Sequence, residues 1–175
     1  MSSPASTDTG SATAAAASAS AARALQDHAA LWNVGESPAT AVVDAACDAL
    51  VAGLDGPALR ILAACTRAEA PYEVHDLLPP ALDELGLTLH PHGSTAGREA
   101  AVRALAGRLV AGELSPRDLT FRVHRRFGHE LPLALRLAEL DDEYDMVEIG
   151  VAAPTELDAE VTAEARRLAR WPGSA

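Results

Sequence analysis

The sequence predicts an all-α protein, built as a compact bundle or a short array of six to eight helices. Hydrophobic residues make up 49% of the 175 residues, but aromatic residues only 3%. The core must therefore consist of Leu, Val and Ala, which suits close helix packing better than strand pairing. The apolar residues also recur at spacings of three and four, the period of a helix face. Glycine and proline signals divide these stretches into separate helices.

The N-terminal stretch, residues 1–20, consists mainly of Ser, Thr, Ala and Gly. Side chains this small bury too little apolar surface to offset the entropy lost on ordering, which predicts a disordered tail. Residues 21–175 are predicted to form a single helical domain. Its first helix runs from Ala21 to about Asn33. The apolar face of that helix consists of Leu25, Ala29 and Trp32.

Two further helices follow, and each has a recognisable start. Ser37-Pro38 combines an N-cap residue with a proline suited to the first helical position, and this helix extends to Gly53. Asp55-Gly56-Pro57 starts a short helix that should end by Pro71. The predicted apolar faces consist of Val42, Val43, Ala46 and Leu50 in the first helix, and of Leu59, Leu62 and Cys65 in the second.

The stretch around Pro79-Pro80 has apolar residues at helical spacing but contains two residues that cannot donate to the preceding turn. The prolines therefore predict a short turn followed by a second short helix that ends at Gly86. Residues 87–97 carry Pro, Gly, Ser and Thr and form the clearest internal loop. Within this loop, Leu87-Thr88-Leu89 is an alternative short strand.

The next two helices meet at a corner that contains Gly112. The first carries apolar residues from Val102 to Val110 and is closed by the glycine. The second starts at Ser115-Pro116, with Asp118 three residues after the cap, a variant of the capping box. Gly128 can close this second helix.

Residues 133–148 show the most regular amphipathic pattern in the chain. The residues of its seam are Leu133, Leu137, Leu140, Tyr144 and Val147. A last helix is predicted to begin at Thr155 and to end before Pro172. Trp171, at its end, is expected to pack on the bundle.

The two glycine corners resemble each other in sequence. Leu50–Pro57 matches Leu109–Pro116 at five of eight positions without a gap. One interpretation is a pair of related helical halves, as in a HEAT-like array. The other is that alanine-rich helices reuse one simple corner, since a match this short in a biased composition is weak evidence of duplication.

The net charge of −11 argues against a general nucleic-acid binder, because neutralising phosphates requires a positive surface. An acidic surface instead attracts a basic protein. Cys47 and Cys65 lie in apolar helical patterns, which predicts buried free thiols. The sequence shows neither a signal peptide nor a membrane span, so the cytoplasm is the expected location.

His90 and His92 flank Pro91 in the predicted loop, and alternate residues of an extended segment can both reach a metal ion. This gives a metal-dependent enzyme as a distant alternative. Further ligands in this part of the sequence are His75, Asp76 and Glu99. The chain has neither a His-Glu-x-x-His motif nor paired Cys-x-x-Cys motifs, so a solvated loop is the simpler interpretation.

His124 and His129 are five residues apart with Gly128 between them. One helix would not aim two side chains at this spacing toward a single point, so we predict surface histidines. No catalytic residue, metal ion or cofactor is predicted anywhere in the chain.

The acidic run in the 133–148 helix is the candidate surface for a partner. Its members are Glu139, Asp141, Asp142, Glu143, Asp145 and Glu148. The run lacks the central glycine of an EF-hand calcium loop. A solvated helix face is one interpretation of the run. The more specific one is a docking surface for a basic partner, where complementary charge speeds encounter.

Arg117, Arg122, Arg125 and Arg126 make the segment from Arg117 to Arg126 the one locally basic helix. With the preceding helix it resembles the recognition element of a helix-turn-helix, which gives a DNA-associated regulator as an alternative function. Arg125 and Arg126 can equally pair with the acidic run, although exposed ion pairs contribute only about 0–1 kcal/mol each.

Three stretches resemble small helical proteins common in Streptomyces-type actinobacteria: Asp48–Arg60 (DALVAGLDGPALR), Leu109–Leu119 (LVAGELSPRDL) and Leu137–Asp145. The resemblance covers roughly residues 40–171. It implies a helical fold and an actinobacterial source. That family carries no assigned activity or site, so the resemblance implies no functional residue.

The chain has no glycine-rich phosphate loop and no Gly-x-Ser-x-Gly elbow, so its motifs give no support to an enzyme. The predicted function is an acidic protein–protein interaction module, immunity- or antitoxin-like, that binds a basic partner. Acidic charge, small size and the lack of catalytic motifs all fit this role.

Overall fold

The computed structural model describes residues 8–148 and 154–170. In these ranges the regular elements are all helical and none is a strand, which confirms the predicted all-α class. The chain divides into two compact units, unit 1 with residues 1–90 and unit 2 with residues 91–175. This division differs from the single helical domain predicted over residues 21–175. Hydrophobic spacing shows which face of a helix is buried, but not which helix covers it.

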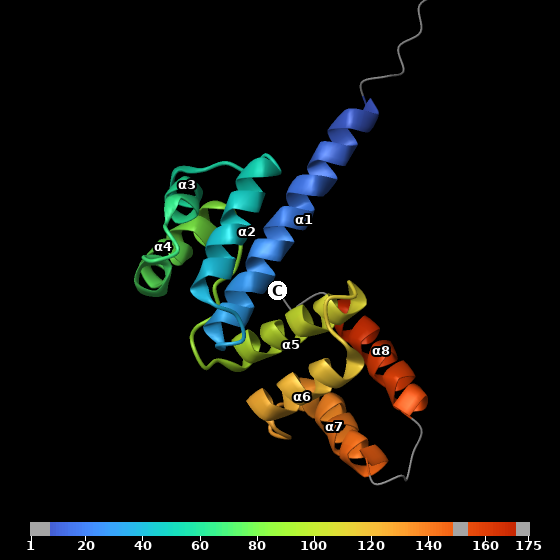
Figure 1. The fold of residues 1–175 in the computed structure, drawn as a ribbon. Helices are drawn as coiled ribbons and strands as arrows, with labels where there is room; N and C mark the ends of the chain where they lie inside the picture. The colour runs from blue at the N-terminus through green and yellow to red at the C-terminus, as the bar shows by residue number, and fades with distance from the viewer. Residues whose placement is uncertain (1–7, 149–153, 171–175) are drawn as a thin grey trace, which may run out of the picture. The chain divides into compact units, whose positions relative to one another are not determined.

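Unit 1 is arranged around helix α2, which packs against α1, α3 and α4 (Figure 1). The helices are α1 Asp8–Asn33, α2 Ala39–Val51, α3 Pro57–Ala64 and α4 Ala70–Glu84. Their core consists of aliphatic side chains, as the composition predicts. The larger members include Leu25, Val42, Leu59, Leu62, Val74, Leu78 and Leu82.

Helix α1 begins at Asp8, so the disordered tail predicted for residues 1–20 overlaps a helix that was expected to start only at Ala21. Residues 10–17 are exposed, and alanine, the strongest helix former, accounts for helix there without a core. One tertiary hydrogen bond supports the segment, because Ser18 Oγ donates to the carbonyl of Ala52, 2.6 Å away. Residues 1–7 lie outside the described residues.

Helix α4 continues without a break through Pro79 and Pro80, so the predicted turn and second short helix are wrong. Both prolines are exposed. The carbonyls that lose their donors belong to His75 and Asp76, which are also exposed, and water can solvate them there. The opposite face of the helix is held in the core by Val74, Leu78 and Leu82.

The segment after α4 is held by a side chain and not by a sheet. The backbone N–H of Thr88 donates to Oε1 of Gln26 over 2.9 Å, and Nε2 of Gln26 donates back to the carbonyl of Thr88. The short strand considered for Leu87-Thr88-Leu89 is absent, and this part of the chain is fully described. The side chain of Gln26 in α1 thus pairs with both backbone groups of Thr88, as a neighbouring strand would.

Cys47 is exposed and Cys65 is half-buried, so the prediction of a buried thiol is wrong for Cys47. Val43 and Ala46 take the core side of α2, which leaves Cys47 at the edge, with its Sγ 3.4 Å from the carbonyl of Ala63. Desolvation by burial raises the pKa of the Cys65 thiol, and the charges of Glu69 and Glu73 raise it further.

No described helix is long and apolar enough to cross a membrane.

In unit 2, α5 packs on α6, α6 on α7, α7 on α8, and α8 back on α5. The elements are α5 Thr95–Val110, α6 Pro116–Phe127, the 3₁₀ turn η1 Pro132–Ala134, α7 Leu135–Glu148 and α8 Pro154–Arg170. Its buried side chains include Val102, Leu105, Leu119, Val123, Leu137, Leu140, Tyr144, Val161 and Leu168. Trp171 and the side chain of Val147 lie outside the described residues.

The two glycine corners have the same geometry. Gly53 and Gly112 both have positive φ angles, 89° and 80°. The next residue closes each corner, since the N–H of Leu54 donates to Ala49 over 3.0 Å and that of Glu113 to Arg108 over 2.8 Å. This is the Schellman arrangement at a helix C-terminus. One corner lies in each unit, and a duplication remains a prediction.

Candidate functional site

A cluster of polar side-chain contacts joins α6 to α7, and the start of α6 explains how it is positioned. Ser115 Oγ accepts from the N–H of Asp118 over 3.1 Å, which confirms Ser115 as the N-cap of α6. The hydroxyl also donates to the carboxylate of Asp118 over 2.7 Å, whereas in a capping box the acid accepts from the backbone N–H of the cap residue. With the helix start fixed, Arg117, Thr120 and His124 follow at spacings of three and four. They therefore lie on one stripe of α6.

Asp141 of α7 is the centre of this cluster and is buried, with 6% of its surface exposed. Its Oδ1 accepts from Arg117 Nη1 over 2.8 Å and lies 3.0 Å from the hydroxyl of Thr120. Its Oδ2 lies 3.0 Å from Nδ1 of His124. A buried carboxylate is tolerated only when it is paired and hydrogen-bonded, and all three partners come from α6.

Arg117 connects a second carboxylate to the cluster. Its Nη2 donates to Asp145 Oδ1 over 2.8 Å, and its guanidinium carbon lies 5.1 Å from the centre of the Tyr144 ring. The arginine is thereby in place for a cation–π interaction as well as two ion pairs. Arg117, predicted as part of a DNA-reading face, contacts α7 instead.

Tyr144 extends the cluster from α7 to α8. Its hydroxyl donates to the carboxylate of Asp158. Burial raises the pKa of Tyr144, the hydrogen bond to Asp158 and the charge of that residue raise it further, and the charge of Arg117 opposes them. The tyrosine therefore stays protonated and acts as a donor between the two helices.

His124 and His129 meet at the end of α6. The helix ends at Phe127, and Gly128 has a φ of 58°, which turns the chain back toward α6. The two imidazole rings are then 4.8 Å apart between centroids and stand edge to face at 76°. His129 is exposed, as predicted, and His124 is half-buried. The two rings meet because the chain leaves the helix between them, whereas the prediction assumed one helix through both residues.

Asp142 completes a group with the two histidines. Its Oδ2 lies 3.1 Å from Nε2 of His129, and its Oδ1 lies 3.7 Å from Nδ1 of His124. One ligand atom from each of the three residues lies within 4.8 Å of the others. We call His124, His129 and Asp142 the His-Asp cluster.

The remaining members of the acidic run also contact cations of unit 2. Arg136 lies 3.3 Å from Glu139 and 2.9 Å from Glu143, and it reaches Glu160 on α8 over 2.6 Å. The side chain of Glu148 lies outside the described residues. The predicted docking surface is therefore, in its described members, part of an ionic network within unit 2.

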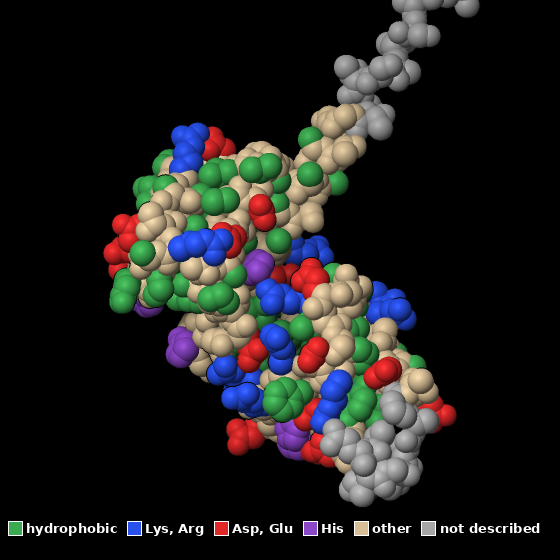
Figure 2. All heavy atoms as spheres, in the orientation of Figure 1, with side chains coloured by type: hydrophobic (Ala, Val, Ile, Leu, Met, Phe, Trp, Pro, Cys, Tyr) green, Lys and Arg blue, Asp and Glu red, His purple; other side chains and the backbone are tan. Residues whose placement is uncertain are grey.

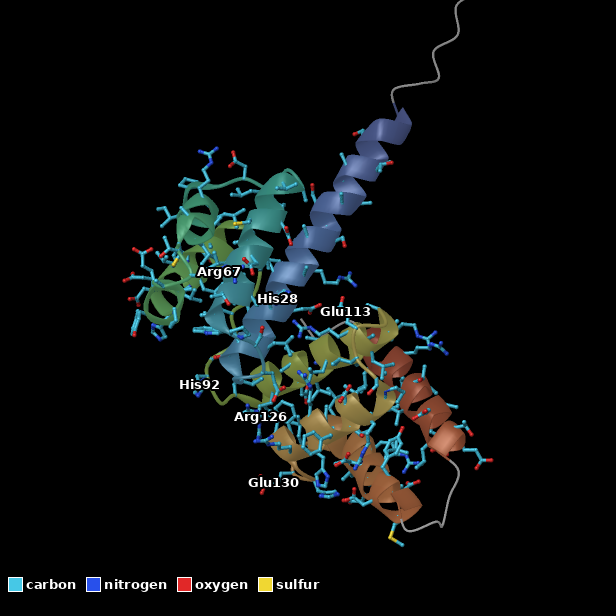
Figure 3. The ribbon with its side chains drawn as sticks, viewed as in Figure 1. His28, Arg67, His92, Glu113, Arg126 and Glu130 are labelled. Atoms are coloured by element: carbon cyan, nitrogen blue, oxygen red, sulfur yellow. The ribbon has the colours of Figure 1, made fainter. Side chains whose placement is uncertain are left out.

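Two other predicted groups are not members of this cluster. Arg125 and Arg126 are exposed in the last turn of α6, where cations suit the helix dipole. Figure 3 labels Arg126 on this turn. The carbonyl of His90 accepts from Asn33 Nδ2 over 3.0 Å, and His92 is exposed. In the described ranges, the three-ligand group is the His-Asp cluster and does not include either of these loop histidines.

Helix α4 of unit 1 carries a second candidate surface. We call Tyr72, Glu73, Asp76 and Asp83 the α4 outer face, since all four are exposed on one side of the helix. Tyr72 has 79% of its surface exposed. The helix contains no Arg or Lys, and Nδ1 of His75 lies 3.2 Å from the carboxylate of Asp76.

The units differ in charge. Unit 1 carries eleven acidic residues and three arginines, a net charge of −8, whereas unit 2 carries fourteen acidic residues and eleven arginines, a net charge of −3. In Figure 2, arginines and carboxylates are interspersed over the visible part of unit 2, while few arginines are visible on unit 1. The uncompensated negative charge is concentrated in unit 1.

Comparison of the chain with protein families, with curated proteins and with solved structures gave no match. Function is therefore inferred from the His-Asp cluster and the α4 outer face. Sequence reasoning missed the His-Asp cluster, although Gly128 between the histidines was a usable signal. It also missed the α4 outer face, because the two prolines were expected to break that helix.

Proposed function

We propose that the protein is an acidic interaction module that binds a basic protein partner through the α4 outer face. The observation that carries the proposal is the combination of an exposed aromatic ring, Tyr72 at 79% exposure, with three exposed carboxylates on a helix that has no arginine. An immunity- or antitoxin-like role, in which the acidic surface masks a basic partner, fits this chemistry.

The distribution of charge supports unit 1 as the binding unit. Its net charge of −8 produces a field that attracts a basic protein and raises the association rate. The acidic run on α7 is less suitable, since Asp141 and Asp145 already pair with Arg117. Breaking such pairs would oppose binding of any partner.

Tyr72 gives the surface an apolar anchor as well as charge. Tyrosine is enriched among the residues that dominate binding energy, because it has a large rigid ring and a polar tip. The backbone beneath it is fixed, since Val74 and Leu78 hold α4 in the core of unit 1. A rigid helix presents the ring without the cost of ordering its backbone on binding.

The test uses the tagged full chain to capture partners from lysate of its source cells at low salt, followed by mass spectrometry. A captured basic protein is then purified, and its binding to wild type and variants is measured by biolayer interferometry. Asp76→Asn with Asp83→Asn should slow association by roughly three- to tenfold. Tyr72→Ala should weaken affinity by roughly tenfold, mainly through faster dissociation.

The matched control removes the same charge from unit 2. Glu130→Gln with Glu156→Gln changes two exposed carboxylates. Glu130 lies in the turn after α6 (Figure 3), and Glu156 lies in the first turn of α8. This variant should associate at nearly the wild-type rate. Equal slowing by both double variants, or capture of no basic protein at low salt, would rule out the α4 outer face as the docking surface.

A further inference from the structure

We propose that the His-Asp cluster is a binding site for a divalent transition-metal ion of the zinc class. The inference concerns unit 2 and does not depend on the docking role of α4. It rests on the positions of His124, His129 and Asp142, which the chain brings together from the end of α6, the following turn and α7.

The distances suit a metal ion. Zinc bonds of about 2.0–2.2 Å to imidazole nitrogen and carboxylate oxygen place neighbouring ligand atoms about 3.3 Å apart in a tetrahedral site. Oδ2 of Asp142 lies 3.1 Å from Nε2 of His129, and Oδ1 lies 3.7 Å from Nδ1 of His124, so each distance is close to that value and each involves a different oxygen of the carboxylate. All three ligand atoms lie within 4.8 Å of one another, so small side-chain rotations suffice to close the site.

The surroundings add negative charge to the site and leave it open. The buried carboxylate of Asp141, fixed by Arg117, lies 3.0 Å from Nδ1 of His124, the nitrogen that faces Asp142. A metal ion bound to Nδ1 would replace the proton between these two groups, and the charge of Asp141 would then favour the ion. The side chains of His129 and Asp142 are half exposed. A cation can therefore enter from solvent, and water can occupy the fourth position.

The donor set determines the class of ion. Two imidazoles and one carboxylate suit zinc and its neighbours in the first transition series. Calcium and magnesium prefer sites made of oxygen ligands, and only Asp142 supplies oxygen in the cluster. Zinc should therefore bind, and magnesium should not compete with it at similar concentration.

The experiment is isothermal titration of the metal-free full chain with zinc chloride, and in parallel with magnesium chloride. Wild type should bind one zinc ion per chain. His129→Gln and Asp142→Asn should each weaken that binding by at least about tenfold. The matched control is His75→Gln, which removes an exposed histidine that also lies 3.2 Å from an aspartate but has no third ligand.

Nuclear magnetic resonance of the histidine rings provides a second readout. Zinc should shift the ring signals of His124 and His129 and leave those of His75 unchanged. Circular dichroism of the variants checks that they fold, and both changed residues are exposed. The proposal is overturned by the absence of zinc binding to wild type, or by a loss of affinity in His75→Gln as large as that in His129→Gln.

Discussion

Helices α1 to α4 of unit 1 are joined mainly by apolar side chains and by side chains that bond to backbone groups, and the ion pair of Asp44 in α2 with Arg67, which precedes α4, is exposed. Helices α6 to α8 of unit 2 are also joined by ion pairs in which one carboxylate is buried. In unit 1, Ser18 reaches the end of α2, and Glu84 of α4 accepts from the N–H of Leu59 in α3 over 3.1 Å. In unit 2, Arg117 and Arg136 connect neighbouring helices through carboxylates.

The difference shows that acidic residues in one chain have different roles, according to the arginines near them. In unit 2 eleven arginines neutralise most of fourteen carboxylates, and the contacts stabilise the packing of helices. In unit 1 three arginines leave the carboxylates of α4 exposed. The acidic run looked most like a docking surface in sequence, yet in the fold the α4 outer face is the more accessible one.

The largest effect is expected from Asp141→Ala. The change leaves Arg117, Thr120 and His124 without their shared acceptor, and losing one partner of a buried ion pair costs about 3–5 kcal/mol. Hydrogen exchange followed by mass spectrometry should show faster exchange in α6 and α7, with α2 and α3 unchanged. Equal acceleration in both units would contradict the separate ionic support of unit 2.

The corresponding change in unit 1 is Leu62→Ala. Leu62 is fully buried in α3, and the cavity should destabilise unit 1 by about 2–5 kcal/mol. Its neighbour Ile61 is 58% exposed, so Ile61→Ala is the control and should change stability by less than about 0.5 kcal/mol. Hydrogen exchange should become faster in α2 to α4. The loss of stability should not depend on salt, because no charge is removed.

A smaller effect is expected from Tyr144→Phe, through the hydrogen bond to Asp158. Loss of this bond should cost about 1–2 kcal/mol near neutral pH. The folded state raises the pKa of Tyr144, so this stability is present below the ordinary tyrosine pKa of about 10 and is lost as the pH rises toward the folded value. The free energy of unfolding, measured with urea, should therefore fall less steeply with rising alkaline pH in the variant than in wild type.

Tyr72→Phe is the control for this measurement, because Tyr72 is exposed on α4. It should keep the alkaline dependence of wild type. If Tyr144→Phe retains that dependence too, the hydrogen bond between α7 and α8 does not contribute to it.

The smallest effect is expected from Ser18→Ala. The hydroxyl donates to the carbonyl of Ala52 at the end of α2, and an average hydrogen bond of this kind contributes about 0.5–1.5 kcal/mol. Exchange should become faster in residues 8–18 and stay unchanged in α3 and α4. Exchange already complete in wild type at these residues would show that the N-terminal part of α1 is not stably helical in solution.

The sequence by itself determined the features that depend on neighbouring residues. The two glycine corners, the N-cap at Ser115 and the buried faces of α2 and α5 all follow from local hydrogen bonding, steric limits and helical spacing. These features involve residues within about one or two helical turns, so a single sequence contains the information.

Only the tertiary structure decided which groups meet. The core beneath α4 keeps the helix intact through Pro79 and Pro80, and the packing of α6 on α7 buries Asp141. The turn at Gly128 brings His129 to His124. Each of these outcomes depends on contacts between helices, which hydrophobic spacing does not specify. For the same physical reason the division into two units, and with it the uneven distribution of charge, was not predictable from the sequence pattern.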